Sequence, residues 1–145
     1  MKLLLSTLGA TGLMLAGSSL CAQEQAKVSH PIHTKVEAML ENAVSTADMI
    51  GAYDKGIVLW DAELNRVYQA LRKALPPPAG EKLKLAQQQW ILYRDAQYAM
   101  IEEQYNQYEG TMYLPMRIAA RMHLTEDRAR YLTLLLQTQQ EHGGE

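Results

Sequence analysis

AQQQWILYRDAQY, residues 86–98, carries the helical pattern from which the rest of the chain can be interpreted. At 3.6 residues per turn, four of its side chains share one face: Ala86, Trp90, Tyr93 and Gln97. Arg94 and Asp95 lie beside that face and offer charged groups to other helices. Two further apolar stripes, 60–71 and 124–135, also carry polar groups among their large side chains. The pattern therefore predicts three helices that meet at a mixed aromatic and polar seam, where each buried polar group needs a partner.

The composition is that of one folded domain. The chain has 145 residues, of which 48% are hydrophobic, enough for a single core. Phenylalanine is absent, and 8 Tyr and 2 Trp supply the aromatic side chains. The formal charge of −2 argues against a nucleic-acid partner, because nucleic-acid binders are clearly basic. A basic protein partner is compatible with this charge.

The N-terminus has the pattern of a secretory signal. Lys2 is followed by the apolar run LLLSTLGATGLMLAG and by small residues that end at Ala22. The run is too short and too rich in glycine for a membrane span, so none is expected in the mature chain. Cleavage after Ala22 would remove Lys2, changing the charge from −2 to −3, and would place the protein in the periplasm. Acylation of Cys21, giving a lipoprotein, ranks lower because Leu20 precedes the cysteine where a small residue is required.

The remaining chain divides by its periodicity. A polar lead-in contains His30 and His33, which we interpret as solvated side chains rather than as metal ligands, since no further ligand stands near them. No segment alternates with period two, so no sheet is expected. The predicted organisation is signal peptide 1–22, flexible lead-in 23–34, helical domain 35–141 and polar tail 142–145.

Within the domain, apolar residues at steps of three and four predict an all-α antiparallel bundle of three long helices with a short N-terminal helix. The short helix covers 36–43. The first long helix begins at a cap on Ser45 or Thr46 and ends at the prolines 76–78. The second is expected over 81–108 and is stopped by Gly110, and Thr111 is expected to cap the third, which accepts Pro115 in its first turn. Gly51 and Gly56 weaken the first long helix, which allows a break or a kink near Gly56.

No pattern of a catalytic, metal or cofactor site is found in the sequence. His123 is a single helical histidine without an assigned partner, and Glu102 and Glu103 point about 100° apart on a helix. The sequence therefore predicts a protein that is not an enzyme and that uses no cofactor or metal. The arginines of the third helix are expected to pair with glutamates of neighbouring helices.

The polar groups of the seam carry more information than these isolated residues. They are Asp61, Asn65, Tyr68, Gln87, Tyr93, Arg94, Asp95, Thr125 and Arg128. Arg94 or Arg128 is expected to bond Asp61 or Asp95 across the bundle, because a guanidinium can hold a carboxylate on another helix with two bonds. Such a network usually specifies a fold. The alternative is that it lines a groove for a ligand or substrate, and the structural interpretation is favoured.

The order of these motifs resembles the LprI-type domain, a small exported helical domain named for a mycobacterial lipoprotein that inhibits lysozyme. The resemblance rests on DAELNxxYxxL (61–71), LxxAQxxWxxYRD (83–95) and LTxxR (124–128), and covers about 40–135. The residues that carry the family motif are Asp61, Leu64, Asn65, Tyr68, Gln87, Trp90, Tyr93, Arg94, Asp95, Thr125 and Arg128. The family usually has four cysteines in disulfides, which would fall near Leu40 and at Ala52, Tyr98 and Ala120. None of these cysteines is present here. The absence of each disulfide would lower the free energy of unfolding by about 2–4 kcal/mol.

The resemblance implies an exported, non-catalytic protein that binds lysozyme or another protein of the envelope. Inhibitors commonly place a loop or an acidic side chain into the cleft of lysozyme. The exposed candidates here are Glu109 with the turn 108–113, and the loop 76–80. The alternative function is a structural or assembly module of the bacterial envelope without inhibitor activity.

Overall fold

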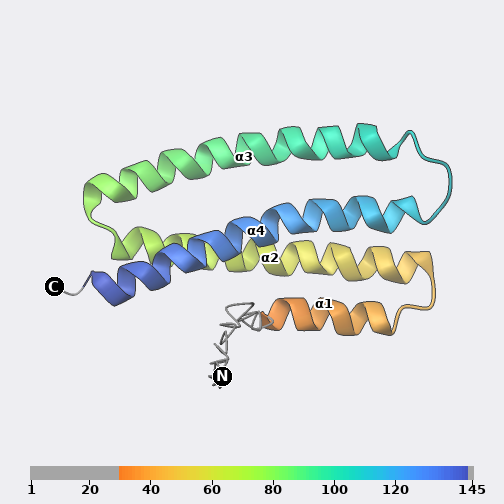
Figure 1. The fold of residues 1–145 in the computed structure, drawn as a ribbon, viewed down its shortest axis with the longest axis horizontal. Helices are drawn as coiled ribbons and strands as arrows, with labels where there is room; N and C mark the ends of the chain where they lie inside the picture. Colours follow the sequence, from red (N-terminus) through yellow and green to blue (C-terminus); the bar gives the residue numbers. More distant parts are fainter. Residues whose placement is uncertain (1–29, 144–145) are drawn as a thin grey trace, which may run out of the picture.

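The computed structural model describes residues 30–143 and folds them into four α-helices (Figure 1). Their bounds are Pro31–Glu41 (α1), Thr46–Ala74 (α2), Pro77–Tyr105 (α3) and Tyr113–His142 (α4). These residues contain no β-strand, which confirms the predicted all-α class. The predicted signal peptide 1–22, Cys21, and most of the lead-in lie outside the described residues.

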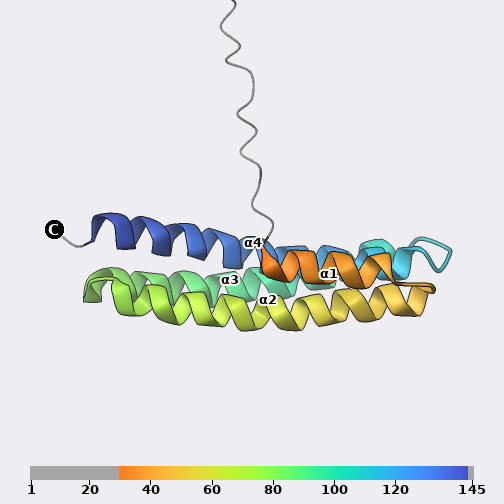
Figure 2. The same cartoon turned by 90° about the horizontal axis from the view of Figure 1, so that it is seen from below.

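The helices pack as a bundle in which successive helices run in opposite directions (Figure 1 and Figure 2). As a result α2 and α4, which form the most extensive contact of the bundle, run parallel to each other. α1 lies against α2, and α3 packs mainly against α4 and less against α2. In the described part of the chain, no helix combines the length and the apolar character needed to cross a bilayer.

The start of α2 is the predicted cap at Ser45. The Ser45 Oγ accepts from the Asp48 backbone N–H at 3.1 Å and donates to Asp48 Oδ2 at 2.7 Å. The Val44 N–H also donates to Asp48 Oδ2, at 3.2 Å. These bonds satisfy N–H groups that the first turn of a helix leaves unpaired, and they lower the pKa of Asp48.

The proline run begins α3 instead of forming a loop. Only residues 75–76 connect α2 to α3, because Pro77 and Pro78 occupy the first helical positions, where no intrahelical N–H bond is required. Gly80, predicted to finish the loop, is buried inside α3 and donates its N–H to the Pro76 carbonyl at 2.9 Å. The expected helix 81–108 is therefore shifted by three to four residues at both ends.

The next connection covers 106–112. Gly110 does not stop α3, because the helix ends at Tyr105 with Asn106 as its C-cap. Its φ of 113°, a conformation that favours glycine, instead serves the connection to α4. The predicted cap at Thr111 is wrong: Met112 precedes α4, without a side-chain hydrogen bond. Pro115 lies in the first turn of α4, as expected.

The core lies between α2 and α4, with α1 and α3 at its sides. Its most buried large side chains are Trp60, Leu64, Val67, Leu71, Thr125 and Leu132. Trp90, expected at the seam where the three helices meet, is only partly buried at the edge of this core, and Tyr93 is 52% exposed. Because α3 lies over the edge of the α2–α4 pair, its aromatic residues face the rim of the core, whereas Trp60 of α2 fills the centre.

α1 begins four residues earlier than its predicted domain boundary, at Pro31, so that 31–34 are its first turn. It can approach α2 closely because Gly56, which is buried, has no side chain. A Cβ at Gly56 would overlap the Met122 sulfur of α4 and press on Val36 of α1. α2 continues through Gly56 as one helix, so no break occurs there.

A comparison of Gly51 with Gly56 tests whether the close approach of α1 and α4 to α2 requires a glycine at position 56. Gly51→Ala is expected to raise the free energy of unfolding by about 0.5–1 kcal/mol, since the position is helical and exposed. A Cβ there meets no atom within 4 Å. Urea unfolding followed by circular dichroism measures the change. Gly56→Ala is the control and should show no such gain; equal stabilisation by both would contradict the close contact at Gly56.

Candidate functional site

Four residues of the predicted polar seam form two local pairs on the surface instead. Asn65 donates to the Asp61 carbonyl at 3.0 Å and to its Oδ2 at 3.3 Å, one turn apart on the exposed side of α2. Arg94 donates to Asp95 Oδ1 at 2.9 Å and 2.7 Å, so its partner is its own neighbour in the sequence. The predicted bond from Arg94 or Arg128 to Asp61 or Asp95 across the bundle is therefore wrong.

Other seam residues do meet, between α3 and α4. Arg128 Nε donates to Gln87 Oε1 at 3.1 Å, and its guanidinium lies 5.9 Å from the Trp90 ring. Thr125, which is 1% exposed, shares a 3.2 Å hydrogen bond with the hydroxyl of Tyr98. These contacts fix the register of α3 on α4. Leu64 lies in the core and Tyr68 packs against it.

The arginines of α4 behave partly as predicted. Arg117 donates to Glu102 of α3 at 2.6 Å, which is the expected pairing with a neighbouring helix. Arg130 instead bonds Glu126 of its own helix, and Arg121 lies 4.5 Å from the ring of Tyr98.

Sequence reasoning missed a polar cluster where α1, α2 and α4 meet. His30, expected to be solvated, caps α1 by accepting the Ile32 N–H at Nδ1, and its ring lies 4.6 Å from that of Trp60. Its Nε2 lies 3.7 Å from Glu63 Oε1. The hydrogen bond from Arg66, at 2.7 Å, is the main cause that lowers the pKa of Glu63. The capping position of a histidine before a proline was the available signal.

Glu126 lies on the α4 side of the same junction and is 5% exposed. Arg130 Nε donates to its Oε1 at 2.8 Å, and His123 Nδ1 lies 3.2 Å from its Oε2. His33 of α1 approaches to 3.7 Å. Burial alone would raise the pKa of Glu126, but the hydrogen bonds from Arg130 and His123 outweigh it and hold the pKa below its ordinary value. The contacts with Arg130 and His123 lie within α4, whereas the approach of His33 joins α1 to α4, which is a structural role.

No metal centre emerges from these groups. Within residues 30–143, no three or more His, Cys, Asp or Glu side chains are arranged to hold a metal ion.

The connection between α3 and α4 is the more exposed candidate site. The ring of Tyr108 lies 4.9 Å from that of Tyr113 and 5.9 Å, edge on, from that of Tyr105. Glu109 follows Tyr108 and is exposed, and its carboxylate has no hydrogen bond or ion pair with any described residue. The aromatic contacts hold the turn, while the acidic side chain at its tip is left available.

An apolar hollow of about 340 Å³ adjoins this turn. It is lined by α2, the turn and the start of α4: Thr46, Met49, Tyr53, Thr111, Met112, Pro115 and Met116. Methionine side chains adapt to different partners, which suits an interaction surface. The other predicted candidate, 76–80, is not an exposed loop, because four of its five residues belong to α3.

Comparison with known proteins agrees with the order of helices and motifs. The sequence model of a family described as Lysozyme inhibitor LprI matches residues 38–132, more than half of the chain. The chain belongs to the LprI family. No curated protein and no solved structure shows a significant match. The LprI match extends from α1 into α4 and includes the whole α3–α4 turn.

The four positions at which the LprI resemblance implies cysteines are occupied by packed side chains. Ala52 is 4% exposed, and Leu40 packs against the core. Tyr98 donates its hydroxyl to the Arg121 carbonyl at 3.3 Å, next to the partly buried Ala120. Packing and hydrogen bonds therefore join α3 to α4 at the level where the LprI pattern has two of its cysteines.

Proposed function

We propose that this LprI-family protein is exported to the periplasm and inhibits a lysozyme, without catalytic activity, by placing the α3–α4 turn in the cleft of the enzyme. The family, whose description is Lysozyme inhibitor LprI, supports the class of partner. The net charge of −2, or −3 after removal of Lys2, favours a basic partner.

The single observation that carries the choice of surface is the unpartnered carboxylate of Glu109. Binding through Glu109 breaks no internal bond, and the Tyr108–Tyr113 contact limits the ordering cost of the turn. The cleft of a glycosidase holds a carboxylic acid whose raised pKa keeps it protonated, and such a group can donate a hydrogen bond to an incoming carboxylate. Glu109 is the acidic side chain of this turn.

The role of Glu109 is tested by removing one negative charge from each end of the bundle in turn. Glu109→Gln is expected to weaken inhibition of a sensitive lysozyme by about tenfold or more, because a charge-assisted bond in the interface is lost. Glu141→Gln, near the opposite end of the molecule, removes the same charge and should leave inhibition unchanged (Figure 1). The inhibition constant is measured in a cell-wall lysis assay. Equal effects of the two variants would point to net charge and contradict a role for the turn.

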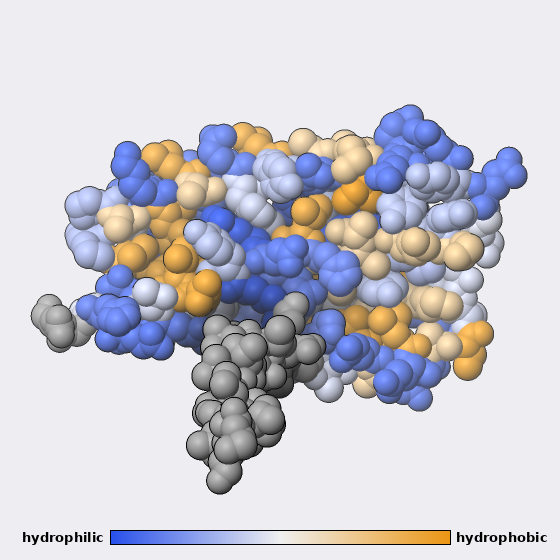
Figure 3. All heavy atoms as spheres, in the orientation of Figure 1, coloured by the Kyte–Doolittle hydropathy of each residue, from blue (hydrophilic) through white to orange (hydrophobic). Residues whose placement is uncertain are grey.

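A structural or assembly role in the envelope is the second candidate. Large apolar side chains are exposed along α3: Leu85, Leu92, Tyr93 and Met100. Figure 3 shows hydrophobic residues at the upper edge of the molecule, where α3 lies. Exposed apolar surface of this kind commonly marks contacts between proteins. Light scattering separates the candidates, since a stable homo-oligomer without lysozyme inhibition supports assembly, and an inhibitory monomer supports the first proposal.

A further inference from the structure

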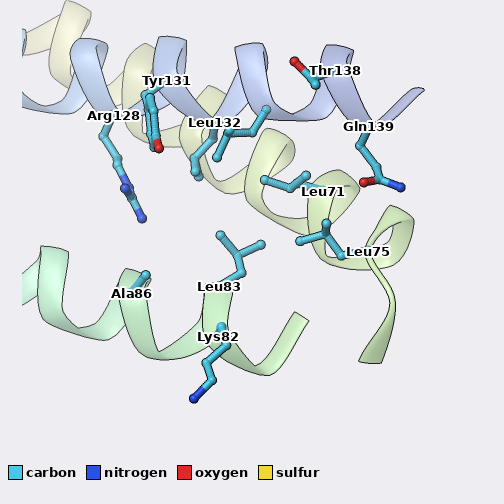
Figure 4. Close-up of a pocket in the computed structure, with 11 residues that line it drawn as sticks. Leu71, Leu75, Lys82, Leu83, Ala86, Arg128, Tyr131, Leu132, Thr138 and Gln139 are labelled. Atoms are coloured by element: carbon cyan, nitrogen blue, oxygen red, sulfur yellow. The ribbon is translucent and has the colours of Figure 1, made fainter. Parts of the chain in front are cut away.

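A second pocket lies at the end of the bundle opposite the α3–α4 turn. It has a volume of about 490 Å³ and is partly open to solvent (Figure 4). Its apolar wall comes from three helices and one connection: Leu71 of α2, Leu75 just after α2, Leu83 and Ala86 of α3, and Leu132 and Leu135 of α4. The volume falls in the range of about 300–1,000 Å³ typical of small-molecule sites.

The pocket follows from the way α3 is attached. The connection 75–76 joins α2 to α3, and α3 then packs mainly on α4, so the pocket lies beside this connection where side chains of the three helices meet. Ala86 is a small residue on the α3 side of the pocket and does not fill the space between the leucines. Contact between water and these apolar walls is unfavourable in free energy. An apolar chain placed between the walls would displace the water and remove that unfavourable contribution.

Arg128 forms the polar wall of the pocket. In Figure 4 its side chain extends from α4 toward α3, beside Ala86. One nitrogen, Nε, is bonded to Gln87, but Nη2 is buried and has no hydrogen-bond partner within residues 30–143. Arg128 also has no ion pair with a described carboxylate. A buried cationic nitrogen without a partner is costly, and burial lowers the pKa of Arg128 accordingly.

The pocket thus combines a long apolar wall with one unsatisfied cationic donor. Lys82 also lines it, but Figure 4 shows its side chain directed away from the leucines. We propose that the pocket binds a single-chain anionic amphiphile, such as a fatty acid, with its acyl chain among the leucines and its carboxylate at the guanidinium of Arg128. This site is independent of the α3–α4 turn and of lysozyme inhibition.

Calorimetric titration of the purified protein tests the proposal, with dodecanoate and dodecanol as probes below the concentrations at which they aggregate. Wild-type protein is expected to bind dodecanoate about tenfold or more tightly than dodecanol, because only the carboxylate satisfies Arg128. Arg128→Gln should remove this preference. Arg121→Gln is the matched control, since Arg121 is also a partly buried arginine of α4 but lies outside the pocket. Absence of dodecanoate binding, or an unchanged preference in Arg128→Gln, would overturn the proposal.

A second variant keeps the test decisive if Arg128→Gln does not fold. Ala86→Phe places a large ring in the pocket from an exposed position of α3 and leaves Arg128 in place. It should abolish binding of both probes while circular dichroism shows native helix content; unchanged binding would exclude this pocket. Vesicles of phosphatidylglycerol test whether the protein binds a membrane surface instead of a free amphiphile. Sedimentation of the protein with vesicles, without binding of free dodecanoate, would overturn the assignment.

Discussion

Replacing Trp60 with alanine is expected to lower the free energy of unfolding by about 3–5 kcal/mol. Trp60 is 1% exposed and belongs to the core cluster between α2 and α4. Its ring also lies 4.6 Å from that of His30 and 5.1 Å from the guanidinium of Arg130. Removal of the indole would therefore leave a cavity and loosen the attachment of α1. Urea unfolding, monitored by circular dichroism at 222 nm, measures the loss.

Trp90→Ala is the matched control, because it removes the same side chain from the rim of the core. Trp90 packs against the core cluster but is only partly buried. A clearly smaller loss of stability is expected than for Trp60→Ala. An equal or larger loss in Trp90→Ala would show that the α3 stripe, rather than α2, anchors the bundle.

The second large effect is expected at Glu126. Glu126→Ala should lower the free energy of unfolding by about 1.5–3 kcal/mol, since hydrogen bonds to charged groups are lost. Arg130 would lose its carboxylate partner, and His33 and His123 would lose the anion that faces them from α4. Thermal unfolding at neutral pH compares the variant with Asp127→Ala, a neighbouring exposed carboxylate that has no ion pair within the described chain and should matter little.

The contribution of Glu126 has a defined dependence on pH. Its pKa is held below the ordinary value of 4.5, so the folded state favours the ionised carboxylate more than the unfolded state does. The stabilisation is therefore complete above pH 4.5 and is lost as the pH falls through the lowered pKa of the folded state. Glu126→Gln cannot titrate, so the stability difference between it and the wild type should shrink on acidification. A difference that stays constant from neutral pH to pH 3 would contradict this role.

The helices that rest on local chemistry could be predicted from the sequence. Ser45 and Asp48 form a cap within four residues. The steps of three and four along α2 place Trp60 and Leu64 on the buried face, as expected. The predicted family follows from motifs whose spacing is visible without any tertiary contact, and the match to LprI confirms it.

Features that depend on packing between helices could not be predicted in the same way. The apolar stripes of α2 and α3 each contain one tryptophan, so the sequence pattern does not distinguish them. Trp90 is partly exposed because α3 lies on the rim of the core. The prolines at 77 and 78 are compatible with either a loop or a first helical turn. Arg94 prefers its neighbour Asp95, because that bond needs no contact with another helix.

The candidate site shows the same division. Glu109 was identified from the sequence as an exposed acidic residue in a turn, whereas its bracing by Tyr108 and Tyr113 depends on how the α3–α4 turn folds. His30 and Glu126 were missed as partners in one junction because they are far apart in the sequence and meet only through α1, α2 and α4. The pocket at Arg128 likewise needs side chains of three helices, which only the packed bundle brings together.

Inhibition of bacterial cell-wall lysis by the purified protein tests the central claim most directly. Lysozymes of the chicken, invertebrate and goose types are assayed over a range of protein concentrations. The proposed function predicts dose-dependent inhibition of at least one type, with loss of inhibition in Glu109→Gln and none in Glu141→Gln. No inhibition of any type at high molar excess would contradict the claim and would favour the assembly role of the same helical bundle.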